Sequence, residues 1–187
     1  MEYDPDIRLM QSTRAMIELQ PVLTGPTLTL RPLLPKDFAA LYAAASDPLI
    51  WEVHPEPTRW QREVFQHFFD SALESKGAFS VEETATGKII GSSRYYDWEP
   101  DKHEIAIGFT FLARSHWGGI TNKEMKQLML NHIFQWADVV WFHIGSSNWR
   151  SRKAMEKIGG QLSHIAPLEL FGVMRDYAYY KIVNPAA

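Results

Sequence analysis

The spacing of apolar residues along the chain changes between the period of a strand and the period of a helix. Alternating apolar positions predict a half-buried strand at 27–33. Short apolar runs bounded by turn residues predict five more strands, at 78–83, 88–97, 103–112, 161–167 and 174–183. A continuous apolar run at 139–144 predicts a further strand that is buried on both faces.

Four segments have helical spacing or helix start and stop residues, and they lie at 35–46, 58–76, 122–137 and 149–158. In the second, Trp60, Val64, Phe68 and Ala72 are expected to form one apolar stripe. The order of elements is strand, two helices, three strands, helix, strand, helix and two strands. Because this order mixes antiparallel hairpins with one strand–helix–strand crossover, it predicts an α+β or mixed α/β domain around one mostly antiparallel sheet of about six to seven strands.

Residues 1–24 precede this pattern and are expected to form a leader arm or a short helix ending near Pro21, so that the domain spans 25–187. The chain has 187 residues, a formal net charge of −3 and no cysteine. The slightly negative net charge argues against a nucleic-acid or membrane partner. The lack of cysteine excludes disulfides and zinc–thiolate sites. With no secretory signal pattern and no apolar run of membrane-spanning length, a cytoplasmic location is expected.

One segment between a strand and a long helix carries a chemical pattern. In Phe111-Leu-Ala-Arg-Ser-His-Trp-Gly-Gly-Ile-Thr-Asn122, Arg114, Gly118 and Gly119 stand just before the helix. Thr121 with Glu124 predicts a capping box at the helix start. A helix N-terminus offers unpaired amides, glycine lets the backbone approach a ligand, and arginine adds donors. The segment therefore predicts a pyrophosphate site; the structural alternative is a glycine turn with a solvated arginine.

Further stretches accompany this loop in a specific order, namely Leu28-Thr-Leu-Arg-Pro-Leu33, Ile90-Gly91, Glu104-Ile-Ala-Ile-Gly-Phe109, Arg114-Ser-His-Trp-Gly118, Asn148-Trp-Arg-Ser-Arg-Lys-Ala-Met-Glu-Lys-Ile-Gly159 and Arg175-Asp176. As a set they resemble the GNAT acetyltransferases, and in particular the Rim-type branch, which includes enzymes that acetylate ribosomal-protein N-termini. The resemblance covers about 25–183. It implies a GNAT-type single domain in which acetyl-CoA lies in a splayed cleft between the strand ending near Leu112 and the strand starting at Val139.

The same resemblance implies an enzyme that transfers the acetyl group of acetyl-CoA directly to a primary amine in a ternary complex, without a metal. The amine is a peptide or protein N-terminus or a small molecule. The residues that the resemblance assigns to the cofactor are Phe109, Thr110, Phe111, Leu112, Arg114, Trp117, Gly118, Gly119, Ile120, Thr121, Asn122, Asn148 and Ser151.

Two departures from the family pattern bear on activity. The phosphate loop holds Ile120 and Asn122 where relatives often have small residues. The frequent general acid, a tyrosine seven residues after the asparagine, is here Met155, which cannot donate a proton. Ser151 is the catalytic candidate in its place, and a helix-capping serine is the structural alternative. These departures motivate a second hypothesis, a non-catalytic acyl-CoA-binding or regulatory module.

Glu104 is the candidate general base, because the resemblance places a glutamate on this strand; a surface carboxylate is the structural alternative. Asp97 and His103 are the other candidates, and a regular strand directs His103 and Glu104 to opposite faces. Four other histidines are expected to be structural, namely His67, His132, His143 and His164.

The acceptor amine is expected against the loop 50–57 and the hairpin 95–100, which combine aromatic residues with carboxylates. For Trp51, Trp60 and Tyr95 the favoured interpretation is that they are partly buried packing residues. Members of the resembled family are often homodimers. The sequence leaves open both the oligomeric state and the identity of the amine.

Overall fold

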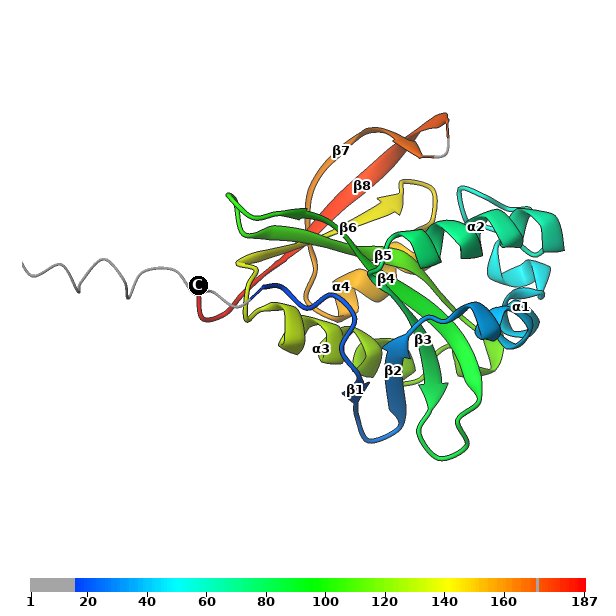
Figure 1. The fold of residues 1–187 in the computed structure, drawn as a ribbon. Coiled ribbons are helices and arrows are strands. Elements are labelled where there is room, and N and C mark those ends of the chain that lie inside the picture. Colours follow the sequence, from blue (N-terminus) through cyan, green and yellow to red (C-terminus); the bar gives the residue numbers. More distant parts are fainter. Residues whose placement is uncertain (1–15, 171) are drawn as a thin grey trace, which may run out of the picture.

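The computed structural model describes residues 16–170 and 172–187, which build one eight-stranded sheet with flanking helices (Figure 1). The spatial order of the strands is β1-β2-β3-β4-β5-β6-β8-β7. The strands are β1 (Leu23–Thr24), β2 (Leu28–Pro32), β3 (Ala78–Glu83), β4 (Ile89–Glu99), β5 (Glu104–Leu112), β6 (Val139–Gly145), β7 (Gln161–Leu170) and β8 (Val173–Val183). The mixed α/β class expected from the sequence is confirmed.

The sheet has eight strands rather than six or seven because the end of the expected leader joins it. Leu23 and Thr24 pair with Leu30 and Thr29 of β2 in an antiparallel ladder. A strand of two residues has too few positions to show a period of two, so the pattern did not reveal it. The rest of the expected leader, residues 1–15, lies outside the described residues.

The pairing of β5 with β6 is the one parallel pairing in this sheet, and it is short. It joins Glu104, Ile105 and Ala106 to residues at the start of β6. Beyond Ala106 the two strands separate, while β6 stays paired with β8 along its full length. The second half of β5 therefore has a ladder on its β4 side alone, and an opening forms in the sheet.

Helices cover both faces of the sheet, two on each side (Figure 1). They are α1 (Phe38–Ala45), α2 (Arg62–Glu74), α3 (Thr121–Ile133) and α4 (Trp149–Lys157). The buried residues of α1 and α2 form one apolar core, and those of α3 and α4 form a second core on the opposite face. Within the described residues no helix is long and apolar enough to cross a membrane.

A bulge in β5 changes the faces to which its side chains point. Two residues of β5, Phe109 and Thr110, lie opposite the single residue Ser93 of β4. Phe109 adopts a φ of 51°, which is uncommon for a residue with a side chain. The extra residue shifts the alternation, so that Ile107 belongs to the core under α3 and Phe111 to the core under α1 and α2.

The second helix differs from its expected position. It starts at Arg62, so Trp60 precedes it and is exposed. Positions four apart drift by roughly 40° per step around a helix, so a strict four-residue series cannot stay on one face. The buried face combines steps of three and four residues, at Phe65, Phe68, Phe69 and Ala72.

The expected capping box of α3 is wrong. Ile120 is the residue before the helix, and no side chain caps it. Glu124 instead accepts hydrogen bonds from the backbone amides of Thr27 (2.8 Å) and Leu28 (3.0 Å). The carboxylate therefore ties α3 to the start of β2, and this contact lowers its pKa against the opposing effect of burial.

Candidate active site

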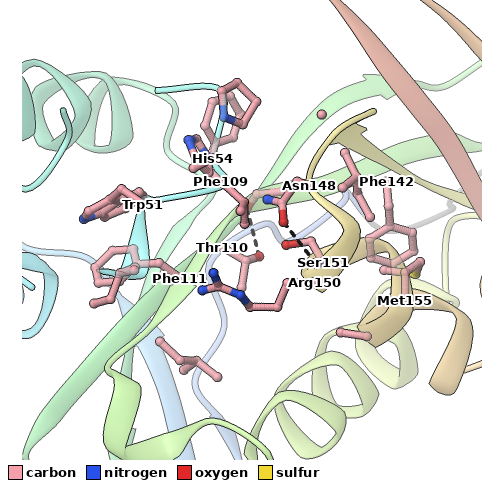
Figure 2. Close-up of a pocket in the computed structure, with 18 of the residues that line it drawn as sticks. Trp51, His54, Phe109, Thr110, Phe111, Phe142, Asn148, Arg150, Ser151 and Met155 are labelled. Atoms are coloured by element: carbon pink, nitrogen blue, oxygen red, sulfur yellow. Dashed lines mark hydrogen bonds between the residues drawn. The ribbon is translucent and has the colours of Figure 1, made fainter. Parts of the chain in front are cut away.

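A cavity of about 480 Å³ lies where β5 and β6 separate. Its walls come from these two strands, from the loop before α3, from the start of α4 and from the segment between α1 and α2. Figure 2 shows Phe109 and Phe111 on one side and Asn148, Ser151 and Phe142 on the other. Because its lining includes residues from both faces of the sheet, the cavity connects the α3/α4 side with the α1/α2 side.

Most of the residues expected to hold the cofactor line this cavity. Those that do are Phe109, Thr110, Phe111, Leu112, Trp117, Gly118, Gly119, Asn122, Asn148 and Ser151. Among the expected site residues, Arg114, Ile120, Thr121 and Glu104 are not part of its lining. The expected cofactor segments thus converge from three separate parts of the chain.

The loop before α3 presents bare backbone to the cavity. Gly118 has a φ of 75°, a conformation that favours glycine, and a Cβ atom on Gly118 or Gly119 would meet no other atom within 4 Å. The indole N–H of Trp117 donates to the carbonyl of Leu112 at 2.9 Å, which fixes the start of the loop. Together with the free amides of the helix start, this open backbone can bind an anion.

The arginine beside the glycine loop is Arg150 and not the expected Arg114. Arg114 forms an ion pair with Asp47 and does not line the cavity. Arg150 of α4 does line it, with its guanidinium 4.3 Å from the ring centre of Trp117. Its nearest carboxylate is that of Glu52, at 3.8 Å. Arg150 therefore places a positive charge beside the glycine loop.

Asn148 and Ser151 lie at the start of α4, across the cavity from β5 (Figure 2). The side-chain oxygen of Asn148 accepts a hydrogen bond from the amide of Ser151 at 3.1 Å, so Asn148 caps the helix. The hydroxyl of Ser151 forms no hydrogen bond to the described residues. Met155 also lines the cavity, and its thioether supplies no proton.

Tyr96 and His143 meet at the point where β5 and β6 part. The hydroxyl of Tyr96 lies 2.8 Å from Nδ1 of His143. Burial and the neighbouring His164 lower the pKa of His143 to about 4, and burial raises the pKa of Tyr96. Both groups are therefore neutral near pH 7, and a neutral imidazole can accept a proton.

Lys126 of α3 is a buried amine beneath the bulge of β5. Its Nζ donates to the hydroxyl of Thr110 at 2.6 Å and to that of Ser93 at 3.2 Å. Burial lowers its pKa to about 7, and within the described part of the chain no carboxylate lies within ion-pair distance of it. Lys126 lines the cavity, and its hydrogen bond to Thr110 holds the bulged segment of β5 on the side that faces α3.

The three residues considered as general bases lie outside the cavity. Glu104 accepts a hydrogen bond from the indole of Trp141 at 3.0 Å, in the part of β5 that is still paired with β6. His103 contacts Asp138, and Asp97 belongs to a separate small surface depression that also includes Glu104. The placement of Glu104 does not support a role as the base in this cavity.

The aromatic residues considered for the acceptor side lie in different places. Trp51 is buried and lines the cavity, but Tyr95 points into the core, where its hydroxyl donates to the carbonyl of Met129 at 2.6 Å. Its neighbour Tyr96 faces the cavity instead. His143, expected to be structural, also lines the cavity.

The sheet opens beside a helix start and a cavity passes through the opening, which is the arrangement that the resemblance to the GNAT acetyltransferases implied. The model of the acetyltransferase (GNAT) domain matches residues 27–161. The chain therefore belongs to the GNAT acetyltransferase family, and the resemblance seen in the sequence is confirmed. No protein of curated function matches the sequence significantly.

Several solved acetyltransferase structures have the same fold at low sequence identity, and three of them are described below. A GCN5-related N-acetyltransferase from Brucella melitensis is 22% identical over 88% of this chain and 79% of its own, with a TM-score of 0.75. The microcin C7 self-immunity acetyltransferase MccE, solved with acetyl-CoA and AMP, is 14% identical over 89% and 99%, with a TM-score of 0.72. Mycobacterium smegmatis RimJ, solved with CoA-disulfide, is 19% identical over 87% and 86%, with a TM-score of 0.67.

Proposed function

We propose that this protein transfers the acetyl group of acetyl-CoA to a primary amine, by direct attack of the amine on the thioester. The observation that carries the proposal is the cavity through the opening between β5 and β6. It has a glycine loop and a helix start at one end and an aromatic, polar segment at the other. Holding two reactants in one such site removes roughly 7 to 11 kcal/mol of the barrier at most.

The cofactor would enter from the α3/α4 side. Its pyrophosphate fits the amides of 117–122 and the start of α3, and Arg150 adds a positive charge there. Its pantetheine arm fits the edge of β5 at 110–112, a stretch that is not paired with β6. Arg114 contributes less than expected, because Asp47 neutralises it.

The proton of the attacking amine is assigned to the pair of Tyr96 and His143. As the new C–N bond forms and the C–S bond breaks, the amine nitrogen must lose a proton, and a neutral His143 can take it. Tyr96 holds the imidazole in place through the 2.8 Å contact. The hydroxyl of Ser151 is free to donate a hydrogen bond to the departing thiolate.

Two measurements test this proposal on the full chain. Titration calorimetry with acetyl-CoA should show saturable binding, and thiol release should depend on an added primary amine. An equimolar panel of alcohols serves as the control, because a hydroxyl is a much weaker nucleophile. Absence of binding at millimolar acetyl-CoA would contradict the proposal.

Met155 favours a second candidate, a non-catalytic acyl-CoA-binding module, because the position lacks the proton donor that relatives often have. Such a module binds acetyl-CoA but releases no thiol with any amine of the panel. The two candidates therefore give the same calorimetric result and opposite results for thiol release.

A further inference from the structure

Arg59 is a buried cation in the wall of the cavity. It lies in the segment between α1 and α2, and its residue surface is 4% exposed. Its guanidinium stands 5.1 Å from the ring centre of Trp51 and 4.7 Å from that of Phe68. Two aromatic rings thus hold the plane of the guanidinium in place without neutralising its charge.

The polar partners of Arg59 are incomplete. Its Nε has no hydrogen-bond partner, and no carboxylate of the described residues lies within ion-pair distance of its guanidinium. The nearby Glu56 raises the pKa of Arg59, yet burial dominates and lowers it to about 10, so the group stays charged at neutral pH. The carboxylate of Glu56 accepts hydrogen bonds from Thr58 instead.

The contact of Arg59 with His54 does not supply the missing acceptor. Nη1 of Arg59 lies 3.3 Å from Nε2 of His54. Nδ1 of His54 already accepts a hydrogen bond from the amide of Glu56 at 2.9 Å, so the proton of the neutral ring resides on Nε2. Burial and Arg59 itself lower the pKa of His54 to about 3, which keeps the ring neutral. Two N–H groups therefore face each other with no acceptor between them.

Arg94, also buried, likewise has an unpaired Nε but does not line the cavity, whereas the partly exposed Arg31 shows a complete set of carboxylate partners. Arg31 forms ion pairs with both Asp37 and Glu82. Leaving one buried charge without a partner is costly, so an unpaired buried cation in a cavity indicates that an anion joins it. Arg175 of β8 lines the same cavity and lowers the pKa of His54 further, which adds to the positive field at this end.

The position of Arg59 separates it from the expected cofactor site. Phe68, against which it stacks, belongs to the core under α1 and α2, whereas the glycine loop leads into α3 on the opposite face. A ligand group at Arg59 therefore belongs to the acceptor and not to the phosphates of the cofactor.

From these contacts we infer that the acceptor amine carries a carboxylate, which binds Arg59 and the N–H of His54. This inference rests on the proposed amine acetyltransferase function and names its substrate class: an amino acid or another amine with a nearby carboxylate. The flat fork of a guanidinium matches the two oxygens of a carboxylate. A phosphate-bearing amine has the same charge with a different shape, and the experiment separates the two.

The test compares acceptors in matched pairs. Thiol release from acetyl-CoA is measured with amino acids and with their carboxamides, and with phosphoethanolamine and ethanolamine. The carboxylates should be preferred over the carboxamides by about 10- to 100-fold in kcat/KM, the range of a hydrogen bond to a charged group. Equal rates for acids and amides, or a preference for the phosphate alone, would overturn the inference while leaving the proposed function intact.

Variants identify the residue responsible. Arg59→Met should abolish the preference for carboxylates over carboxamides, chiefly by lowering kcat/KM for the carboxylates. Because methionine packs well between aromatic rings and removes an unpaired buried charge, this variant should melt at the same temperature or higher. Arg62→Met is the matched control, since Arg62 is exposed, stacks on Phe38 and Tyr42 and does not line the cavity. An unchanged preference in Arg59→Met would overturn the inference.

A binding measurement keeps the inference testable if no amine is acetylated, the result that would defeat the proposed function. With CoA present, N-acetylglycine should raise the melting temperature of the native chain more than N-acetylglycinamide does, and Arg59→Met should remove the difference. Equal shifts for the two probes in the native chain would overturn the inference.

Discussion

The hydroxyl of Tyr96 lies 2.8 Å from Nδ1 of His143, and this contact joins β4 to β6 across the point where β5 leaves β6. It depends on Gly108 of β5, because a Cβ atom there would lie 2.9 Å from Cε1 of Tyr96. The pair therefore sits at the closed end of the opening, and both residues line the cavity.

Adjacent tyrosines should respond in opposite ways to loss of the hydroxyl. Tyr96→Phe should lower kcat by at least about 10-fold with little change in the KM for acetyl-CoA, since it removes the group that holds His143. Tyr95→Phe should lower the free energy of unfolding by about 0.5 to 1.5 kcal/mol, since it removes a buried hydrogen bond to the carbonyl of Met129, and should leave kcat unchanged. Steady-state kinetics and urea denaturation measure the two effects. Equal kcat values for both variants would refute the assignment.

Variants of Asn148 and Ser151 should likewise separate an effect on stability from an effect on kcat. Asn148→Ala removes the cap of α4 and should cost about 1 kcal/mol of stability in addition to weakening cofactor binding. Ser151→Ala leaves the cap in place and should reduce kcat alone. Denaturation with urea measures the stability of both variants, and assays at saturating acetyl-CoA measure their kcat. A marked loss of stability in Ser151→Ala would show that Ser151 has a structural role instead.

Lys126 should make the fold less stable as the pH falls. In the unfolded chain the amine keeps its proton up to about pH 10.5, whereas in the folded state burial lowers the pKa to about 7. Between these values the unfolded state binds more protons, so the free energy of unfolding decreases from pH 10 toward pH 7 and this contribution is constant below it. Lys126→Met should be more stable than the native chain, and the difference should be larger at pH 7 than at pH 9. Denaturation at both pH values measures it, and a difference independent of pH would contradict the burial of a titrating amine.

Gly119 should matter to the cofactor and not to the fold. A side chain at this position meets no protein atom within 4 Å and projects into open space beside the loop. Gly119→Val should therefore weaken acetyl-CoA binding by about 10-fold or more while the melting temperature without cofactor stays unchanged. Gly119→Ala should give an intermediate value. Calorimetry on the two variants tests this, and full affinity in Gly119→Val would exclude the loop from the cofactor site.

Local patterns were enough to predict the type of most elements and the glycine turn before α3, because both depend on neighbouring residues. Contacts between distant residues were not predictable in this way. Glu124 fits a capping box by its spacing, yet it binds Thr27, which lies 97 positions away in the sequence. The carboxylate accepts hydrogen bonds from amides at the turn between β1 and β2, and no local rule reveals a contact at this distance in the sequence.

The candidate site shows the same limit. Tyr95 and Tyr96 cannot be ranked from the sequence, because the pairing of β4 with a bulged β5 decides which of them faces the cavity. Glu104 stands at the paired end of β5, and the separation from β6 begins after Ala106. No sequence pattern pointed to Arg59, because its candidate role rests on a missing hydrogen-bond partner that only the structure shows.

Initial rates measured over a matrix of acetyl-CoA and amine concentrations test the central claim most directly. Direct attack in a ternary complex predicts amine-dependent thiol release, one acetylated amine per thiol by mass spectrometry, and double-reciprocal lines that intersect. Parallel lines, which indicate a covalent acetyl-enzyme, or thiol release that does not depend on the amine, would contradict it.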